Sequence, residues 1–430
     1  MTAIPDARPF PRDPRRRGVP ETNTEAEEIS ARVISDRAEG EAYVASVCFK
    51  HGPPRLLGVE LEYTVHDIAD PTAPLTARRL AEALGPHAPR TLVPDSAAVP
   101  LPHGSALTLE PGGQVEISTA PASSFRSLAE SAESDRAHVA DLLARAGLRL
   151  GSHGIDPFRP PSRVLPTPRY AAMERRFAPL GSGGVTMMCS TAAIQVCVDA
   201  GEAHELPRRW AAAHAVGPAL LALFANSRRH AGADTGFASA RWLAVMDTEP
   251  CRTEAANPCD DPVSAWAGRV LDTPLMVLRR DGGSWDAPAR LTFAEWIEGR
   301  EDGAALSRPT FGDLDYHLTT FFTPVRPHGY LEIRYLDAQQ GEGWTPPAAL
   351  VAALLSDSST VDSVLDLCEP VSGRWADAAR FGMDDPSLAS VARAVGELGC
   401  AALPNLGLPG HTIADIAKVV ERRWLRREGE

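Results

Sequence analysis

The stretch LGVELEYTV, residues 57–65, alternates apolar side chains with glycine, glutamate and threonine at every position. Successive side chains of a β-strand point to opposite faces, so this pattern predicts a strand with one face on a core and one polar face. Glu60 and Glu62 fall on the polar face together. The alternation recurs in three later segments, residues 107–118, 191–199 and 331–335.

The segment at 107–118 is interrupted in its middle by Pro111, Gly112 and Gly113. We expect a bulge in one continuous strand there, or a close approach of another backbone. If the bulge leaves the register intact, Glu110, Gln114 and Glu116 share one face of this strand.

Helical patterns fill the intervals between the predicted strands. Residues 124–146 and 207–225 read as helices, the second interrupted near Gly217 and Pro218. From about residue 347 onward the pattern is helical throughout, and the last helix is expected to start after Thr412 as its N-cap. Strands with one polar face, separated by helices, predict an α+β fold on a mainly antiparallel sheet packed by helices.

The composition of the chain limits its domain organisation, its location in the cell and its binding partners. Prolines and arginines in residues 1–22 predict a disordered tail, and we expect residues 23–430 to form a single domain. No apolar run is long enough to span a membrane, and no secretory signal opens the chain, so a cytoplasmic protein is expected. The net charge of -13 argues against a nucleic-acid partner. Seven cysteines without a CxxC pair are expected to be reduced thiols.

The acids of the predicted sheet face repel one another. Carboxylates at alternate or cross-strand positions lie about 5 to 7 Å apart, where they repel by about 2 to 3 kcal/mol. A solvated outer face is the simpler interpretation, but none of the four segments contains a lysine to balance the charge. Glutamate and glutamine oxygens suit magnesium or manganese, so we favour a metal-binding face.

Arginines that receive anionic substrates are expected between residues 159 and 176. Their guanidinium groups can bind carboxylate or phosphate, although Arg175 and Arg176 also fit a basic surface helix. The predicted substrate-binding residues are Arg159, Arg163, Arg169, Tyr170 and Arg241. The glycine-rich residues 181–184 fit either a phosphate-lining loop or a flexible one, and no Walker A or GxGxxG motif is present.

Several of these segments together resemble the plant-type and bacterial glutamate-cysteine ligases, and most closely the bacterial branch that serves ergothioneine synthesis. The similar segments are residues 58–67, 107–119, 154–177, 190–201, 224–227, 313–327 and 331–339. EPGGQVE at 110–116 and EIRYLD at 332–337 are the most specific. The resemblance implies a glutamine-synthetase-like catalytic domain with divalent metals, magnesium or manganese, on its polar face.

The resemblance also implies roles for individual residues. The implied metal ligands are Glu60, Glu62, Glu110, Glu116, Gln195 and Glu332, with Gln114 beside them. Arg334 and Gln195 would bind ATP, with Arg334 in contact with its phosphate, and Arg334 and Glu332 are the expected catalytic residues. Arg169 and Arg241 would help to hold glutamate.

The implied reaction is the ATP-dependent joining of the glutamate side-chain carboxylate to the amine of cysteine, through an acyl phosphate. ATP, L-glutamate and L-cysteine are therefore the expected partners. Two alternatives stay open: a related ligase or guanidine kinase that acts on another acid or amine, and an inactive relative that only binds. The sequence does not reveal the oligomeric state, and a monomer is the favoured expectation.

Overall fold

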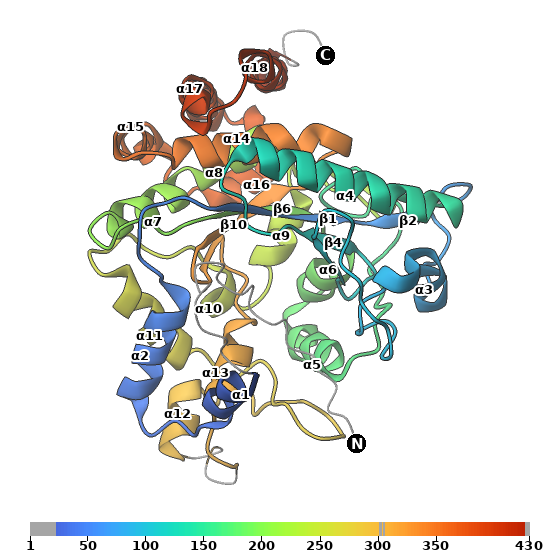
Figure 1. Ribbon diagram of the computed structural model, residues 1–430, viewed down its shortest axis with the longest axis vertical. Helices are drawn as coiled ribbons and strands as arrows, with labels where there is room; N and C mark the ends of the chain where they lie inside the picture. Colours follow the sequence, from blue (N-terminus) through green and yellow to red (C-terminus); the bar gives the residue numbers. More distant parts are fainter. Residues whose placement is uncertain (1–22, 301–302, 304–305, 426–430) are drawn as a thin grey trace.

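A six-stranded antiparallel sheet crosses the middle of the computed structural model, which describes residues 23–300, 303 and 306–425 (Figure 1). The predicted tail at 1–22 lies outside these residues. The strand order is β3-β4-β1-β6-β10-β9, and every neighbouring pair is antiparallel. The strands are β1 (Leu57–Tyr63), β3 (Ala106–Leu109), β4 (Val115–Ser118), β6 (Ala193–Val198), β9 (Val325–Pro327) and β10 (Leu331–Asp337).

The segment at 107–118 is a hairpin and not one bulged strand, so the predicted bulge is wrong. Glu110 N–H donates to the Gln114 carbonyl at 2.9 Å, and Gly113 N–H donates to the Glu110 carbonyl at 2.8 Å. Gly113 has a φ of 84°, which favours glycine and lets the chain reverse. The close backbone approach is confirmed, because a Cβ atom on Gly112 would overlap the carbonyl oxygen of Cys189.

The first predicted strand is also divided. β1 ends at Tyr63, and the chain continues as β2 (Val65–Asp67), which pairs with β5 (Leu148–Leu150) in a separate two-stranded sheet. A third small sheet joins β7 (Arg229–His230) to β8 (Ala233–Asp234). The central sheet therefore receives only the part of this segment that carries Glu60 and Glu62.

Helices cover the apolar face of the sheet. The inner helices are α4 (Phe125–Arg145), α8 (Gly217–Phe224) and α14 (Thr345–Leu354), which contact β1, β10 and β6 respectively. Val59, Leu61 and Ile333 on this face are at most 1% exposed. In Figure 1 these helices lie above the sheet, and the C-terminal helices lie farther out on the same side. Those helices are α15 (Ser358–Cys368), α17 (Pro386–Ala402) and α18 (Gly410–Leu425), whereas α16 (Trp375–Phe381) lies beside α8.

The predicted helices are present with small shifts of their ends. The interruption near Gly217 is confirmed, since α7 (Leu206–Ala215) ends before α8 begins. The last helix starts at Gly410, so Thr412 lies inside it and is not its N-cap. No single helix among the described residues meets the length and hydropathy needed to cross a membrane, and one bent pair, 341–354 with 358–371, does so by length and composition only.

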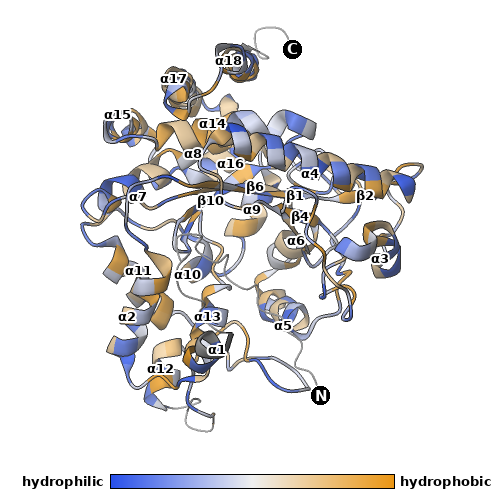
Figure 2. Cartoon of the chain, viewed as in Figure 1, coloured by the Kyte–Doolittle hydropathy of each residue, from blue (hydrophilic) through white to orange (hydrophobic). Residues whose placement is uncertain are grey.

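Two groups of helices lie below the polar face of the sheet in Figure 1. One group contains α1 (Asn23–Ala31), α2 (Arg37–Cys48), α11 (Pro262–Asp272), α12 (Phe293–Glu298) and α13 (Phe311–Leu318). The other contains α3 (Ala77–Leu84), α5 (Pro168–Phe177) and α6 (Gly183–Ser190), and α9 (Ala240–Met246) and α10 (Pro250–Thr253) lie between the two groups. In Figure 2 these helices carry both hydrophobic and hydrophilic residues, as helices with one buried side do.

Candidate active site

A cavity of about 1040 Å³ opens on the polar face of the sheet. Residues of the strands form its floor, and residues of α5, α6, α9 and the segment 318–330 form its walls. Ten of the predicted site residues line it: Glu60, Glu62, Glu110, Gln114, Glu116, Arg169, Tyr170, Gln195, Arg241 and Arg334. The sheet therefore brings together side chains that are far apart in the sequence.

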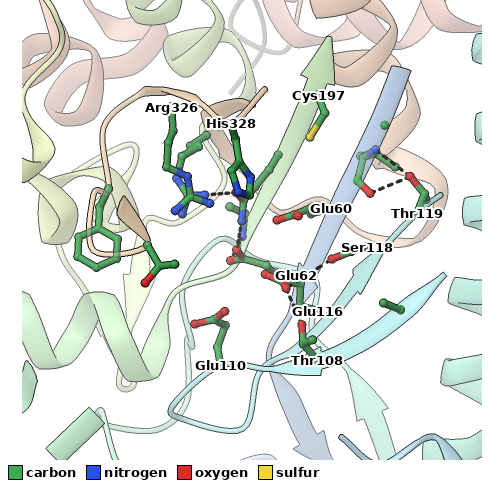
Figure 3. Close-up of a pocket in the computed structure, with 18 of the residues that line it drawn as sticks. Glu60, Glu62, Thr108, Glu110, Glu116, Ser118, Thr119, Cys197, Arg326 and His328 are labelled. Carbon is green, nitrogen blue, oxygen red and sulfur yellow. Dashed lines mark hydrogen bonds between the residues drawn. The ribbon is translucent and has the colours of Figure 1, made fainter. Parts of the chain in front are cut away.

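The pairing of the strands explains how the acids meet. Glu62 on β1 lies opposite Glu116 on β4, and Glu116 lies opposite Thr108 on β3. Two residues before Glu62 on the same strand, Glu60 lies opposite Gln195 on β6. Figure 3 shows Glu60, Glu62, Glu110 and Glu116 turned toward one shared space. The prediction that acids from separate segments share one face of the sheet is confirmed.

Glu62 is the acid whose environment disfavours its charge most clearly. Burial, followed by the nearby charges of Glu110 and Glu116, raises the pKa of Glu62 to about 8, although Arg334 and Arg241 oppose the shift. Its Oε1 accepts a hydrogen bond from Gln195 Nε2 at 2.5 Å, and its Oε2 accepts one from Ala193 N–H at 2.9 Å. A cation beside these acids would favour the charged form and lower this pKa.

The hairpin supplies two further polar side chains to the cavity, Thr108 and Gln114. Thr108 Oγ1 donates to Glu116 Oε1 at 2.5 Å, which fixes that carboxylate. Gln114 Nε2 donates to the carbonyls of Met188 and Thr191 at 3.2 and 2.9 Å. Gln114 Oε1 is buried and has no hydrogen-bond partner in the protein. An orphaned buried acceptor is costly, so this oxygen is suited to receive a ligand.

Glu332 does not line the cavity but lies beneath two arginines that do. Arg326 Nε and Nη2 donate to its two oxygens at 2.6 and 3.1 Å, and Arg334 Nη1 donates at 2.9 Å. Burial opposes ionisation of Glu332, but the charges of Arg326 and Arg334 outweigh it and lower its pKa below the usual range. The structure therefore places Glu332 as the anchor of both arginines.

Arg326 is a cavity residue that the sequence did not reveal. It lies on β9, directly opposite Glu332 in the register. β9 has only three residues, one of them proline, so it shows no alternation that would mark it as a strand. Arg334 Nη1 also donates to Gln195 Oε1, so both ends of the Gln195 amide have protein partners.

Arg159 and Arg163 lie outside the cavity, so the structure does not bring them together with the other predicted substrate-binding residues. Arg159 Nε donates to Asp156 at 2.9 Å, and its Nη2 donates to the Val65 carbonyl at 2.8 Å. Arg163 donates to Glu174 at 2.9 Å and to the Leu165 carbonyl at 3.1 Å. Both guanidinium groups are thus occupied in joining neighbouring segments.

Arg169 and Tyr170 reach the cavity because α5 starts just before them, with Thr167 as N-cap. Arg169 Nη1 donates to Thr319 Oγ1 at 2.8 Å, and its guanidinium lies 4.9 Å from the centre of the Tyr316 ring. Arg241, in the first turn of α9, is 3% exposed and donates through Nε to Asp337 at 2.7 Å. The two arginines bring positive charge to a cavity that also contains the acids.

The glycine-rich residues 181–184 do not line the cavity. A Cβ atom on Gly183 would lie 2.6 Å from the Asp247 carbonyl oxygen, and one on Gly184 would overlap Phe177. The glycines therefore allow α6 to pack closely against its neighbours, and the phosphate-lining alternative is not supported. All seven cysteines are free, as expected, including Cys251 and Cys259.

Comparison with known families and proteins gives consistent matches. The model of Glutamate-cysteine ligase family 2 matches residues 56–403. The chain is 37% identical over 398 residues to glutamate-cysteine ligase EgtA of Mycobacterium tuberculosis, which covers 90% of this chain and 87% of that protein. It is 36% identical over 365 residues to EgtA of Mycolicibacterium smegmatis, with 82% of each chain covered. The chloroplastic glutamate-cysteine ligase of Brassica juncea is 30% identical over 339 residues, 76% of this chain and 65% of that protein.

The fold is similar to that of the glutamate-cysteine ligase of Francisella tularensis, which was solved in complex with AMP. The TM-score is 0.52 at 13% sequence identity, and the match covers 89% of this chain and 84% of the other. At this identity the likeness concerns the fold alone. Together with the antiparallel sheet packed by helices, it confirms the predicted α+β fold class.

Proposed function

The chain belongs to glutamate-cysteine ligase family 2, and from this premise we propose that it joins the γ-carboxylate of L-glutamate to the amine of L-cysteine with ATP. The product would be γ-glutamylcysteine, and the EgtA relatives support a role in ergothioneine synthesis. The observation that carries the proposal is the convergence of acids from β1 and the β3–β4 hairpin with arginines from α5, α9 and β10 on one cavity.

The cavity fits a divalent metal by its donor chemistry. Glu60, Glu62, Glu110 and Glu116 would hold magnesium or manganese, and the orphaned Gln114 Oε1 lies beside them. Among the residues that the structure describes, no three His, Cys, Asp or Glu side chains form a ready-made metal cluster. Magnesium is usually held by one or two carboxylates together with substrate phosphates, so the acids and ATP would complete the site together.

When bound, the metal would neutralise the charge of the ATP phosphates. Arg334 and Arg326 would contact the transferred phosphoryl group, because both line the cavity and Glu332 holds them in place. We therefore replace the predicted catalytic and metal-binding roles of Glu332 with a positioning role. Gln195 would position Arg334 and Glu62 through its two amide ends.

The reaction proceeds in two steps. A γ-carboxylate oxygen of glutamate attacks the γ-phosphorus of ATP, the bond to the β,γ-bridging oxygen breaks, and ADP leaves. The cysteine nitrogen then attacks the carbonyl carbon of the acyl phosphate, phosphate leaves, and the amine loses a proton. Arg169, Tyr170 and Arg241 would hold glutamate at the other wall of the cavity, where guanidinium groups can bind its α-carboxylate.

The test is to incubate the purified protein with MgATP, L-glutamate and a series of amines, and to identify the product by mass. Phosphate release that requires both L-glutamate and L-cysteine, with a product of the mass of γ-glutamylcysteine, is the expected result. Phosphate release with another acid or amine in their place would assign a different ligase or kinase activity. Absence of ATP turnover with every substrate set would leave only a binding protein.

The remaining expectations from the sequence are part of the proposal. We propose that residues 23–430 act as one catalytic domain, that the protein is a monomer, and that it works in the cytoplasm. Size-exclusion chromatography with light scattering tests the second point, and a mass near 45.9 kDa is expected.

A further inference from the structure

We propose that Asp337 is a positioning residue that fixes Arg241 in the wall of the cavity, where Arg241 receives the α-carboxylate of glutamate. The inference rests on the proposed function and adds a residue that has not been assigned to the site. Asp337 is the last residue of β10, whereas Arg241 belongs to α9, so their contact joins the sheet to the cavity wall.

Four donors hold the carboxylate of Asp337, which is completely buried. Its Oδ1 accepts hydrogen bonds from Arg241 Nε at 2.7 Å and from Ser239 Oγ at 2.9 Å. Its Oδ2 accepts hydrogen bonds from Ser227 Oγ at 2.7 Å and from Asn226 N–H at 2.8 Å. Each oxygen thus has two partners, which sets the orientation of the carboxylate.

The same serines fix the start of α9. Ser239 is its N-cap and accepts from Trp242 N–H at 3.2 Å, and Ser227 Oγ accepts from Arg241 N–H at 3.2 Å. A Cβ atom on Gly154 would lie 2.7 Å from Asp337 Cγ, so the glycine backbone lies close against the carboxylate. Asp337 therefore controls both the backbone and the side chain of Arg241.

This arrangement leaves part of the Arg241 guanidinium available to a ligand. Arg241 lines the cavity and is 3% exposed, and its Nη2 is buried without a hydrogen-bond partner in the protein. A buried charge needs a partner, and Asp337 supplies one through Nε alone. The remaining donors of the planar group can then bind a carboxylate, as arginine commonly does.

A second pair, in which a buried aspartate binds a partly buried arginine, serves as a control. Asp156 is 4% exposed and accepts from Arg159 Nε at 2.9 Å, much as Asp337 accepts from Arg241. Arg159 does not line the cavity. Replacing Asp156 should therefore cost stability without an effect on substrate binding, whereas replacing Asp337 should affect both.

The test compares Asp337→Asn and Asp156→Asn in the full-length enzyme by steady-state kinetics and thermal unfolding. Neutral asparagine keeps the size but weakens the hold on Arg241. We expect KM for glutamate to rise about tenfold in Asp337→Asn, with KM for ATP and cysteine within about twofold of wild type. Asp156→Asn should lower Tm by about as much as Asp337→Asn does, but it should leave KM for glutamate unchanged.

Two further variants separate positioning from general damage. In an Arg241→Ala background, Asp337→Asn should cause no additional rise in KM for glutamate, because the residue acts through Arg241. Should Asp337→Asn fail to fold, Ser227→Ala removes one donor from the carboxylate and should raise KM for glutamate by a smaller factor. Unchanged KM in both Asp337→Asn and Ser227→Ala, equal rises in the two aspartate variants, or additive effects with Arg241→Ala would each overturn the inference. An inactive wild type would instead refute the proposed function.

Discussion

Glu60 and Glu62 lie two residues apart on one face of β1, yet their surroundings differ. Both oxygens of Glu62 accept hydrogen bonds from the protein, and the residue is 9% exposed. Glu60 is only half-buried and lies between Ser118 and Gln195 in the register. Of the two acids, Glu60 is thus the more accessible to a metal–nucleotide complex, and Glu62 shapes the charge beneath it.

Replacing Glu60 with Ala should abolish turnover without unfolding the protein. The side chain lines the cavity and contributes no apolar packing to the core, so we expect kcat to fall by at least about 100-fold with little change in Tm. Product formation and thermal unfolding measure the two effects. The control is Glu82→Ala on α3, whose side chain is 63% exposed and which should behave as wild type. Near-normal turnover of the Glu60 variant would contradict the metal assignment.

Asp315 gives a prediction for the pH dependence of stability. Burial raises its pKa from 3.8 to about 6, and Tyr43 Oη donates to both of its oxygens at 2.9 and 3.0 Å. A raised pKa means that the folded protein binds this proton more tightly than the unfolded chain. The stability that the protonated Asp315 contributes to the folded protein is fully present below about pH 4. It is lost as the pH rises through about 6.

Asp315→Asn should remove this loss because the amide does not ionise. Relative to wild type, its free energy of unfolding should gain about 2 kcal/mol between pH 4 and pH 7. Denaturant unfolding of both proteins at the two pH values measures the gain. A pH-independent difference between the two proteins would show that Asp315 does not titrate as a buried acid.

At the scale of elements, the sequence predicts those strands that have one polar and one apolar face. The alternation at 57–65, 191–199 and 331–335 corresponds to β1, β6 and β10, and the acids fall on the predicted face. Alternation does not distinguish a bulged strand from a hairpin, because the two arms of a hairpin show the same period. That is why residues 107–118 were expected as one strand.

Other elements leave no periodic signal at all. β9 is too short to alternate, so Arg326 and its pairing with Glu332 are visible only in the structure. The arginine-rich stretch 159–176 contains Arg159, Arg163 and Arg169, and nothing in its composition distinguishes them. Of the three, only Arg169 lines the cavity. Arg159 pairs with Asp156, three residues before it, and Arg163 pairs with Glu174 in α5. The sequence contains these acids, but it does not show which arginine pairs with one and which faces the cavity.

The tight turn of the hairpin should depend on Gly112. Its missing side chain lets the turn approach the Cys189 carbonyl at the end of α6, and a Cβ atom there would overlap that oxygen. Gly112→Ala should therefore lower the free energy of unfolding by at least about 2 kcal/mol and displace Glu110, Gln114 and Glu116, with a fall in kcat. Gly410→Ala, where a Cβ atom would meet nothing within 4 Å, should leave both quantities unchanged. Wild-type stability of Gly112→Ala would mean that the turn moves freely.

At the scale of the whole molecule, charge is distributed unevenly. The chain carries a net charge of -13, yet the cavity combines acids and cations. Four glutamates and Asp199 line it together with Lys50, Arg90, Arg169, Arg241, Arg326 and Arg334. A highly anionic nucleotide would meet repulsion from the acids unless a cation lies between them. The arginines alone do not remove it, since Arg326 and Arg334 share Glu332, and Arg241 is paired with Asp337. Binding of ATP should therefore require a divalent cation.

MgATP should stabilise the folded protein, whereas ATP with EDTA should not. At a ligand concentration of about 100 times Kd, binding contributes about 2.7 kcal/mol, which for a chain of this length raises Tm by about 3 °C. Thermal unfolding with MgATP, ATP plus EDTA, and Mg²⁺ alone measures this without any turnover. Glu60→Ala should lose most of the MgATP shift because it removes a carboxylate from the shared face, and Glu82→Ala should retain it. An equal shift with ATP plus EDTA would show that the arginines alone receive the nucleotide and that the acids serve another purpose.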